Sequence, residues 1–178
     1  MQAAPALPKA PGARGLKAGE VDLTVTNATP ARAKDMDFSP TLLEVELGYL
    51  VPPGSRVSAP AAIDRTGIRV GVSQGGTSHA VLTHEMKNAT VVPVPTVKAA
   101  IDMLKAGTLD VFATNKGILF EIADAVPGAK ILEGRWGLEH FAFAIPKGRE
   151  NGAAYLRAFA EDVKNSGALR RAGLRGEA

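Results

Sequence analysis

Strand-like and helix-like segments alternate along the chain from about residue 67 onward, and this alternation limits the choice of fold more than any other feature. Short β-rich runs at 68–73, 90–94 and 109–113 are each followed by a segment with helical signals. A strand that is followed by a helix and then by another strand forms a parallel pair, because the helix crosses back over the sheet. The pattern therefore predicts an α/β domain with a largely parallel sheet flanked by helices.

The helical segments carry recognisable start and stop signals. Thr96 precedes a run whose apolar residues recur at helical spacing, and Gly107 follows it, so a capped helix is predicted between them. Further helices are predicted from residue 77 to about 87, over 116–125 and over 151–165. The last of these is predicted to be amphipathic, with three large side chains on its apolar side: Tyr155, Phe159 and Val163.

The first part of the chain is less regular. Residues 1–19 are rich in Ala, Pro and Gly and show no periodicity, which predicts an irregular arm that buries little. The run 20–27 alternates apolar and polar residues, so a half-buried strand is predicted with Val21, Leu23 and Val25 on its buried face. Additional strands are predicted at 42–51, 130–132 and 140–145.

Composition excludes several classes of function. The 178 residues include no cysteine, so disulfides, thiolate nucleophiles and cysteine-based metal sites are ruled out. The net charge of +3 is spread over interleaved acidic and basic residues, and we expect no nucleic-acid partner. No apolar run reaches the 18 or so residues that a membrane span needs, and residues 1–15 lack the pattern of a secretory signal peptide.

A glycine-rich loop, Gln74-Gly75-Gly76-Thr77-Ser78, joins a predicted strand to a predicted helix. Glycines allow close backbone approach, and amide groups at a helix start favour an anion such as a carboxylate or phosphate. The alternative is a tight turn in which Thr77 serves as a helix N-cap. The loop lacks the lysine of a Walker A motif and the spacing of a dinucleotide fingerprint, so neither cofactor is predicted.

Few other residues point to chemistry. Arg32 follows a predicted strand, where its guanidinium could hold a carboxylate through paired hydrogen bonds or form an exposed salt bridge. His79 and His84 are five residues apart, which predicts different helix faces and no zinc motif. We therefore expect no metal site, no cofactor and no visible nucleophile.

Five short motifs occur in a definite order. They are Gly19–Asp22, Thr29–Arg32, Asp37–Ser39, Val70–Thr77 and Ala106–Val111. The set resembles the family 3 extracellular solute-binding proteins of amino-acid ABC transporters, whose usual forms are G-x-V-D, T-x-x-R, D-F-S, V-G-V-x-x-G-T-T and G-x-x-D-A. The resemblance covers the chain from about residue 19 to residue 167.

This resemblance implies a type II periplasmic-binding-protein fold, in which two lobes close over a small ligand, and a function without catalysis. It implies a carboxylate-binding role for Arg32, Gly75, Gly76 and Thr77, and a ligand-binding role for Asn27. It also implies ABC permease membrane subunits as partners and a periplasmic location. The corresponding segments are an irregular arm at 1–19, a partial first lobe at 20–55, a second lobe at 56–140 and a return to the first lobe at 141–178.

Two departures from the family pattern affect the ligand and the assembly. Asn115 stands where the family has an acidic residue for the ligand's α-ammonium group, and a neutral amide is a poorer acceptor for a cation. The ligand is therefore predicted to be an amino acid or a related organic acid. Two strand-helix units that the family places before its G-x-V-D motif have no counterpart, so the first lobe is predicted to be partial and a homodimer could complete it.

Two other functions stay open at this point. A dehydratase-like enzyme on the same fold would need a proton donor, for which the candidates are His79, Lys116, Glu139 and His140. A truncated relative that binds nothing is the other alternative.

Overall fold

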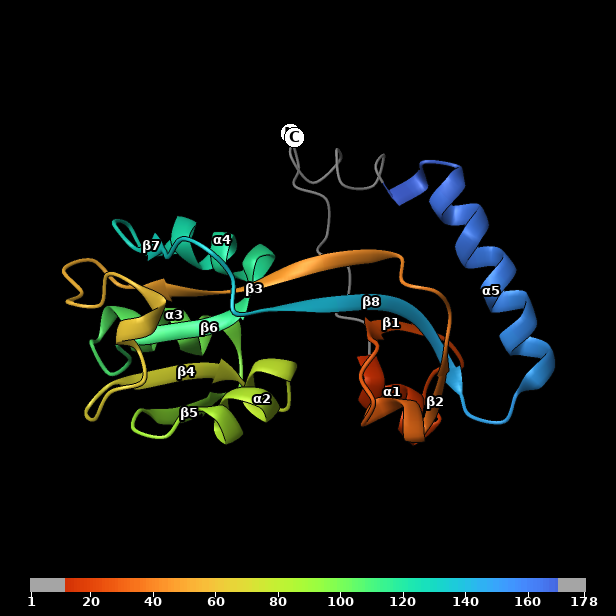
Figure 1. Ribbon diagram of the computed structural model, residues 1–178, viewed down its shortest axis with the longest axis horizontal. Coiled ribbons are helices and arrows are strands. Elements are labelled where there is room, and N and C mark those ends of the chain that lie inside the picture. The colour runs from red at the N-terminus through yellow and green to blue at the C-terminus, as the bar shows by residue number, and fades with distance from the viewer. Residues whose placement is uncertain (1–11, 170–178) are drawn as a thin grey trace. The chain divides into compact units, whose positions relative to one another are not determined.

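The computed structural model describes residues 12–169 (Figure 1). The chain divides into two compact units: unit 1 comprises residues 1–44 and 140–178, and unit 2 comprises residues 45–139. The first boundary thus falls at residue 44, whereas the sequence placed it at residue 55. The segment between them belongs to unit 2 because it pairs there with other strands, beginning with Leu47 opposite Asn115.

Unit 2 is built from strands with helices between them. Its elements are β3 (Leu43–Val51, from residue 45 onward), η2 (Pro60–Ala62), β4 (Arg69–Ser73), α2 (Thr77–Glu85), β5 (Thr90–Val94), α3 (Val97–Lys105), β6 (Val111–Asn115), α4 (Lys116–Ala125) and β7 (Lys130–Ile131). Strand β4 pairs in parallel with β5 and β6, while β3 pairs antiparallel with β6 and β7.

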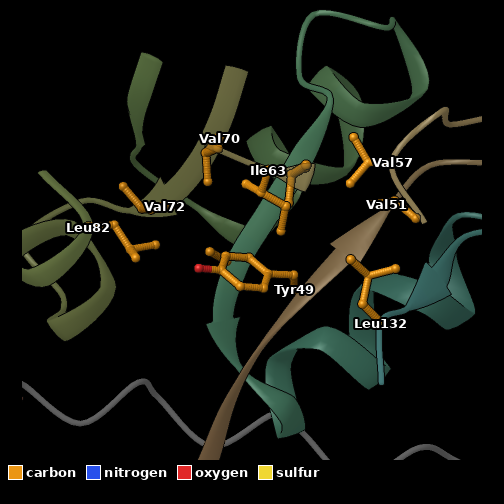
Figure 2. Close-up of a cluster of buried hydrophobic side chains, with 10 residues drawn as sticks. Tyr49, Val51, Val57, Ile63, Val70, Val72, Leu82 and Leu132 are labelled. Carbon is orange, nitrogen blue, oxygen red and sulfur yellow. The ribbon is translucent and has the colours of Figure 1, made fainter. Parts of the chain in front are cut away.

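Successive residues of these strands enter two different cores, because side chains alternate across a pleated sheet. We call the two clusters the Tyr49 core and the Phe112 core, after one central residue of each. The Tyr49 core includes Leu82 of α2, and Figure 2 shows Tyr49 at its middle. The Phe112 core includes residues of α3 and α4, so these helices cover the opposite face of the sheet. The Tyr49 core consists of Tyr49, Val51, Val57, Ile63, Val70, Val72, Leu82, Val111, Ala113 and Leu132. The Phe112 core consists of Leu50, Val94, Ala100, Leu104, Leu109, Phe112, Leu119, Ile122 and Val126.

Gly71 of β4 faces the Phe112 core at a point of very close packing. A Cβ atom at this position would lie 2.5 Å from Leu109 Cδ1 and 2.8 Å from Phe112 Cδ2. Both neighbours are themselves buried, so neither has room to retreat. Glycine is therefore required here for packing.

Unit 1 contains antiparallel strands and flanking helices. Its elements are α1 (Gly12–Ala18), β1 (Thr24–Asn27), η1 (Arg32–Lys34), β2 (Met36–Phe38), β8 (Gly137–Pro146, from residue 140 onward) and α5 (Glu150–Asn165). Both β1 and β2 pair with β8, and α5 contacts β2. The α/β class is as predicted, but the strand pairing is mixed: β1 and β2 are antiparallel to β8 in unit 1, and β3 is antiparallel to β6 and β7 in unit 2.

Residues 12–18 correct the prediction of an irregular arm. They form helix α1, and its Leu16 is only 3% exposed because it packs with Met36 and Ala144. A helix of seven residues is too short to show a reliable apolar period, which explains why the sequence pattern missed it. Residues 1–11 of the predicted arm lie outside the described residues.

The buried face of β1 is the opposite of the one predicted. Leu23 and Val25 are each 46% exposed, whereas Thr24 and Thr26 are buried. The two threonines lie opposite the buried Ala144 and Ala142 of β8, and α1 packs against this strand. The threonines and not the apolar residues therefore take the inner face of β1.

Helix α5 also turns a different side inward. Its buried residues are Leu156 and Ala160, while Tyr155 is 71% exposed and Phe159 is 37% exposed. Phe159 still contacts Phe143 of β8, with ring centroids 5.3 Å apart. None of the helices within residues 12–169 is both long enough and apolar enough to cross a membrane.

Candidate functional site

The parallel strands of unit 2 end at a common edge of the sheet. Val72 of β4 lies opposite Ala113 of β6, and Ser73 lies opposite Val94 of β5. The glycine-rich loop after β4 and Asn115 at the end of β6 therefore follow the same edge. Ligands of open α/β sheets bind outside this carboxyl edge, so the register brings two of the predicted ligand-binding segments to a suitable position.

The glycine-rich loop leads directly into α2. Gly75 adopts a positive φ of 72°, and the Gly76 amide donates to the Ser73 carbonyl at 3.0 Å. Gly76 is the N-cap of α2 and no side chain caps it, so the predicted N-cap role of Thr77 is wrong: Thr77 is the first helical residue. A helix start without a side-chain cap favours an anion, because its amide groups and its dipole both present positive charge.

A shallow hollow of about 200 Å³ lies beside this loop. It is lined by Gly75, Gly76, His79, Ala80, Thr83 and His84. Both histidines line the same hollow, although their spacing predicted different faces of the helix. His79 is oriented by the loop, since its Nδ1 accepts a hydrogen bond from the Gly75 amide at 3.2 Å. Within residues 12–169, no three histidine, aspartate or glutamate side chains gather in a way that could hold a metal ion.

Asn115 is held at both ends of its amide. Its Oδ1 accepts from the Ile118 backbone amide at 3.1 Å, which makes it the N-cap of α4. Its Nδ2 donates to Glu139 Oε2 at 3.2 Å. Glu139 is only 8% exposed. A buried carboxylate therefore lies next to Asn115, the residue that replaces the acidic residue of the family pattern.

The cations near this position have a different partner. Lys116 Nζ lies 2.5 Å from Glu46 Oε2, and Arg135 Nη1 lies 3.3 Å from Glu46 Oε1. The hydrogen bond from Lys116 is the main reason that the pKa of Glu46 is lowered. Glu46 thus engages both cations.

Arg32 lies in unit 1, in the short helix η1 that follows β1. Its Nη1 donates to Thr26 Oγ1 at 3.1 Å and to the Asn27 carbonyl at 3.0 Å, and its backbone amide donates to Thr29 Oγ1 at 3.3 Å. These bonds orient the guanidinium from the end of a strand. They also place Arg32 in contact with Asn27, another residue of the predicted site.

Asn27 has a structural role that the sequence did not reveal. It is 4% exposed, and its Oδ1 accepts from the His140 backbone amide at 2.8 Å. The Ala28 amide donates to the His140 carbonyl at 2.9 Å, so the two contacts extend the β1–β8 pairing. His140 Nδ1 in turn lies 3.3 Å from Glu44 Oε1.

Glu139 contacts Asn115, one of the predicted ligand-binding residues. The sequence analysis considered Glu139 only as a candidate proton donor. The available signal was an acidic residue immediately before an alternating apolar strand, which is an unusual place for a charge. Its proximity to Asn115 depends on the pairing of distant strands and could not be inferred from spacing.

Comparisons with known proteins agree with the resemblance. The ABC transporter glutamine-binding protein GlnH of Bacillus subtilis (strain 168) is 26% identical over 154 residues, which are 85% of this chain and 56% of that protein. The chain thus spans a little over half the length of this curated relative. No family model matches the chain.

Two solved structures have similar folds. The arginine-, lysine-, histidine-binding protein ArtJ of Geobacillus stearothermophilus aligns with a TM-score of 0.73 and 26% identity, covering 90% of this chain and 71% of that one. The ancestral amino acid-binding protein AncCDT-1, a precursor of cyclohexadienyl dehydratase, aligns with a TM-score of 0.78 and 19% identity, covering 89% and 70%. The chain is therefore related to the solute-binding proteins of amino-acid ABC transporters and has the type II periplasmic-binding-protein fold.

Proposed function

We propose that the chain is the solute-binding component of an ABC transporter and captures a small carboxylate-bearing ligand, an amino acid or a related organic acid. Arg32 of unit 1 and Gly75, Gly76 and Thr77 of unit 2 bind the carboxylate, and Asn27 and Asn115 contribute polar contacts. The partners are the permease subunits in the membrane, and the location is the periplasm. The similarity to GlnH supports the transporter assignment.

The observation that carries the proposal is the start of α2. Gly76 caps this helix without a side chain, directly after β4 and at the carboxyl edge of the parallel strands. Serine or aspartate at an N-cap would satisfy the first amides of the helix internally. Glycine supplies no such side chain, and a helix start favours an anion such as a carboxylate.

Replacing Arg32 tests the proposal. The probes are L-glutamine, L-arginine, L-lysine and L-histidine, together with 2-oxoglutarate and phenylpyruvate, each titrated by isothermal calorimetry. We expect at least one probe to bind, and Arg32→Ala to weaken its binding by about 100-fold or more, because a charge-assisted contact to a carboxylate is lost.

Arg149→Ala is the matched control, since Arg149 is an exposed arginine of the same unit that pairs with Asp22. It should bind the same probe with unchanged affinity. Circular dichroism and the melting temperature show whether Arg32→Ala is folded, and Arg32→Lys, which keeps the charge, should recover part of the affinity. Equal affinity of Arg32→Ala and the wild type would contradict the assignment.

The proposed function involves no catalysis. Two of the candidate proton donors lie next to carboxylates: Lys116 pairs with Glu46, and His140 Nδ1 lies 3.3 Å from Glu44 Oε1. His79 accepts a hydrogen bond from the backbone. The alternative is a dehydratase-like enzyme, since AncCDT-1 is described as a precursor of a dehydratase. The homodimer stays a prediction.

A further inference from the structure

His79 connects the first turn of α2 back to the glycine-rich loop. Its Nδ1 accepts a hydrogen bond from the Gly75 amide at 3.2 Å. A backbone amide can only donate, so Nδ1 must carry a lone pair, and the ring is neutral with its proton on Nε2. Both residues line the hollow of about 200 Å³ beside the loop. The contact therefore exists for one protonation state of the imidazole alone.

The loop depends on such contacts because its own backbone restrains it little. Gly75 and Gly76 are adjacent glycines, and glycine loses more conformational freedom on ordering than any other residue. The Gly76 amide donates to the carbonyl of Ser73 at the end of β4, which ties the loop to the strand before it. The hydrogen bond to His79 ties the Gly75 peptide to the helix after it. Loss of this second contact therefore leaves the loop less ordered.

Few charged groups lie near α2. The helix contacts β4, β5 and β6, and neither β5 nor β6 contains a titratable side chain. Arg69, at the other end of β4 from the loop, pairs with Asp110, and burial raises the pKa of Tyr49 to about 12. Histidine is the side chain whose charge ordinarily changes between pH 5 and pH 8, so His79 and His84 are the groups to compare. Besides His79, the titratable or charged groups that the described residues place on or beside the helix are His84, Glu85, Lys87, Asp64, Arg69 and Tyr49.

We propose that His79 is a positioning residue of the carboxylate-binding loop, and that it holds the loop only while its imidazole is neutral. Protonation places a hydrogen on Nδ1, which then faces the Gly75 N–H as a second donor, and the contact breaks. The ligand must then order a looser loop when it binds, so carboxylate capture is stronger at neutral than at mildly acidic pH. For its ligand this inference rests on the proposed function, whereas the contact itself can be tested without a ligand.

NMR of the full chain, labelled with ¹⁵N and free of ligand, tests the contact. We expect His79 to show the Nε2–H tautomer at pH 8, and the Gly75 amide to exchange more slowly than in an unstructured peptide at the same pH. This protection should fall as His79 titrates. His79→Ala should reduce it about tenfold at pH 7.5, the size expected from one hydrogen bond. His79→Asn should keep it throughout, because the asparagine Oδ1 is attached to Cγ as Nδ1 is and accepts without titrating.

Isothermal calorimetry at pH 7.5 and pH 5.5 tests the effect on binding. The probes are L-glutamine, L-arginine, L-lysine and phenylpyruvate, whose charges are the same at both pH values. We expect a probe that binds the wild type to bind about tenfold more weakly at pH 5.5. His79→Ala should bind weakly at both pH values, and His79→Asn should bind at both as the wild type does at pH 7.5. His84→Asn is the matched control, since His84 lines the same hollow, and it should keep the pH dependence of the wild type.

The outcomes distinguish this inference from the proposed function. If the Gly75 protection does not change as His79 titrates, or if His79→Asn keeps the pH dependence of binding, His79 does not position the loop, while carboxylate capture stands. Tighter binding at pH 5.5 would mean that the imidazolium charge acts on the ligand itself, and it too would overturn the inference.

If no probe binds to the folded wild type, the proposed function is overturned, and the Gly75 protection alone decides the role of His79. Circular dichroism shows whether His79→Ala is folded. If it is not, His79→Asn and the pH profile of the wild type carry the test.

Discussion

Unit 2 and unit 1 of this chain bury their apolar residues to very different extents. The strands of unit 2 contribute to a core on each face, and Val70, Val72, Leu119 and Ile122 are fully buried. In unit 1 the cluster around Leu16 is small, and several large apolar side chains are exposed: Leu23, Val25, Leu43, Tyr155 and Phe159. A sheet between two helical layers has a strongly determined side-chain pattern, whereas a sheet with a small core tolerates apolar residues at its surface.

The largest effect should come from the core of unit 2. Phe112→Ala removes a ring that is 1% exposed from the Phe112 core, and we expect the free energy of unfolding to fall by about 4 kcal/mol in urea denaturation. Phe120→Ala in α4 is the control, because that ring is 60% exposed and its loss should cost less than about 0.5 kcal/mol. Similar losses in the two variants would mean that the difference in burial carries no energetic weight.

A smaller effect should follow from the same type of change in unit 1. Leu16→Ala removes a 3% exposed side chain from contact with Met36 and Ala144, and we expect a loss of about 2 kcal/mol, near the lower end for buried leucines. The matched variant is Leu23→Ala, which should change stability by less than about 0.5 kcal/mol because Leu23 is 46% exposed. A larger loss for Leu23→Ala would show that β1 buries its apolar face after all.

The smallest effect concerns charge. Arg69 holds both carboxylate oxygens of Asp110 at 2.8 and 2.9 Å, and these hydrogen bonds lower the pKa of Asp110 below its ordinary value of 3.8. Since the pKa is lower in the folded chain, the ionised group stabilises the fold above about pH 3.8, and this stabilisation is lost as the pH falls through the folded value. Asp110→Asn should therefore flatten the acid side of the stability curve, measured by urea denaturation between pH 5 and pH 2.5.

Asp22→Asn supplies the comparison from unit 1. Asp22 pairs with Arg149, but the two side chains are 83% and 55% exposed, and pairs of this kind contribute little. We expect its stability curve to follow that of the wild type. If the free energy of unfolding of the two variants falls equally between pH 5 and pH 2.5, the Arg69–Asp110 ion pair of unit 2 has no special role in acid stability.

The sequence predicted unit 2 well for a physical reason. Helix α4 has the predicted bounds, and α3 is capped by Thr96, whose side chain accepts from the Ala99 amide at 3.0 Å. Local signals suffice where strand, cap and helix follow one another. They failed in unit 1 because the inner face of β1 depends on α1 and β8, and the sequence around Leu23 contains no information on which face these cover.

The candidate site was predictable only in part. The loop at Gly75 and Gly76 and the position of Arg32 follow from local patterns and from the family resemblance. The contact between Asn115 and Glu139 spans 24 residues and depends on how strands of different elements meet. Spacing along the chain does not reveal such a contact. Asn115, compared with the acidic residue of the family pattern, therefore suggested that this position had lost its negative charge.

The order of the units along the chain has a consequence for biosynthesis. Unit 2 is one continuous stretch, but unit 1 is assembled from both sides of it, and its Asn27–His140 hydrogen bond joins residues 113 positions apart. A chain emerging from the ribosome can complete unit 2 before residues 140–146 of β8 appear, whereas β1 and β2 must wait for these residues, with which they pair. Until then the apolar residues of α1 have no sheet to cover, so we expect this interval to be when the nascent protein depends most on chaperones.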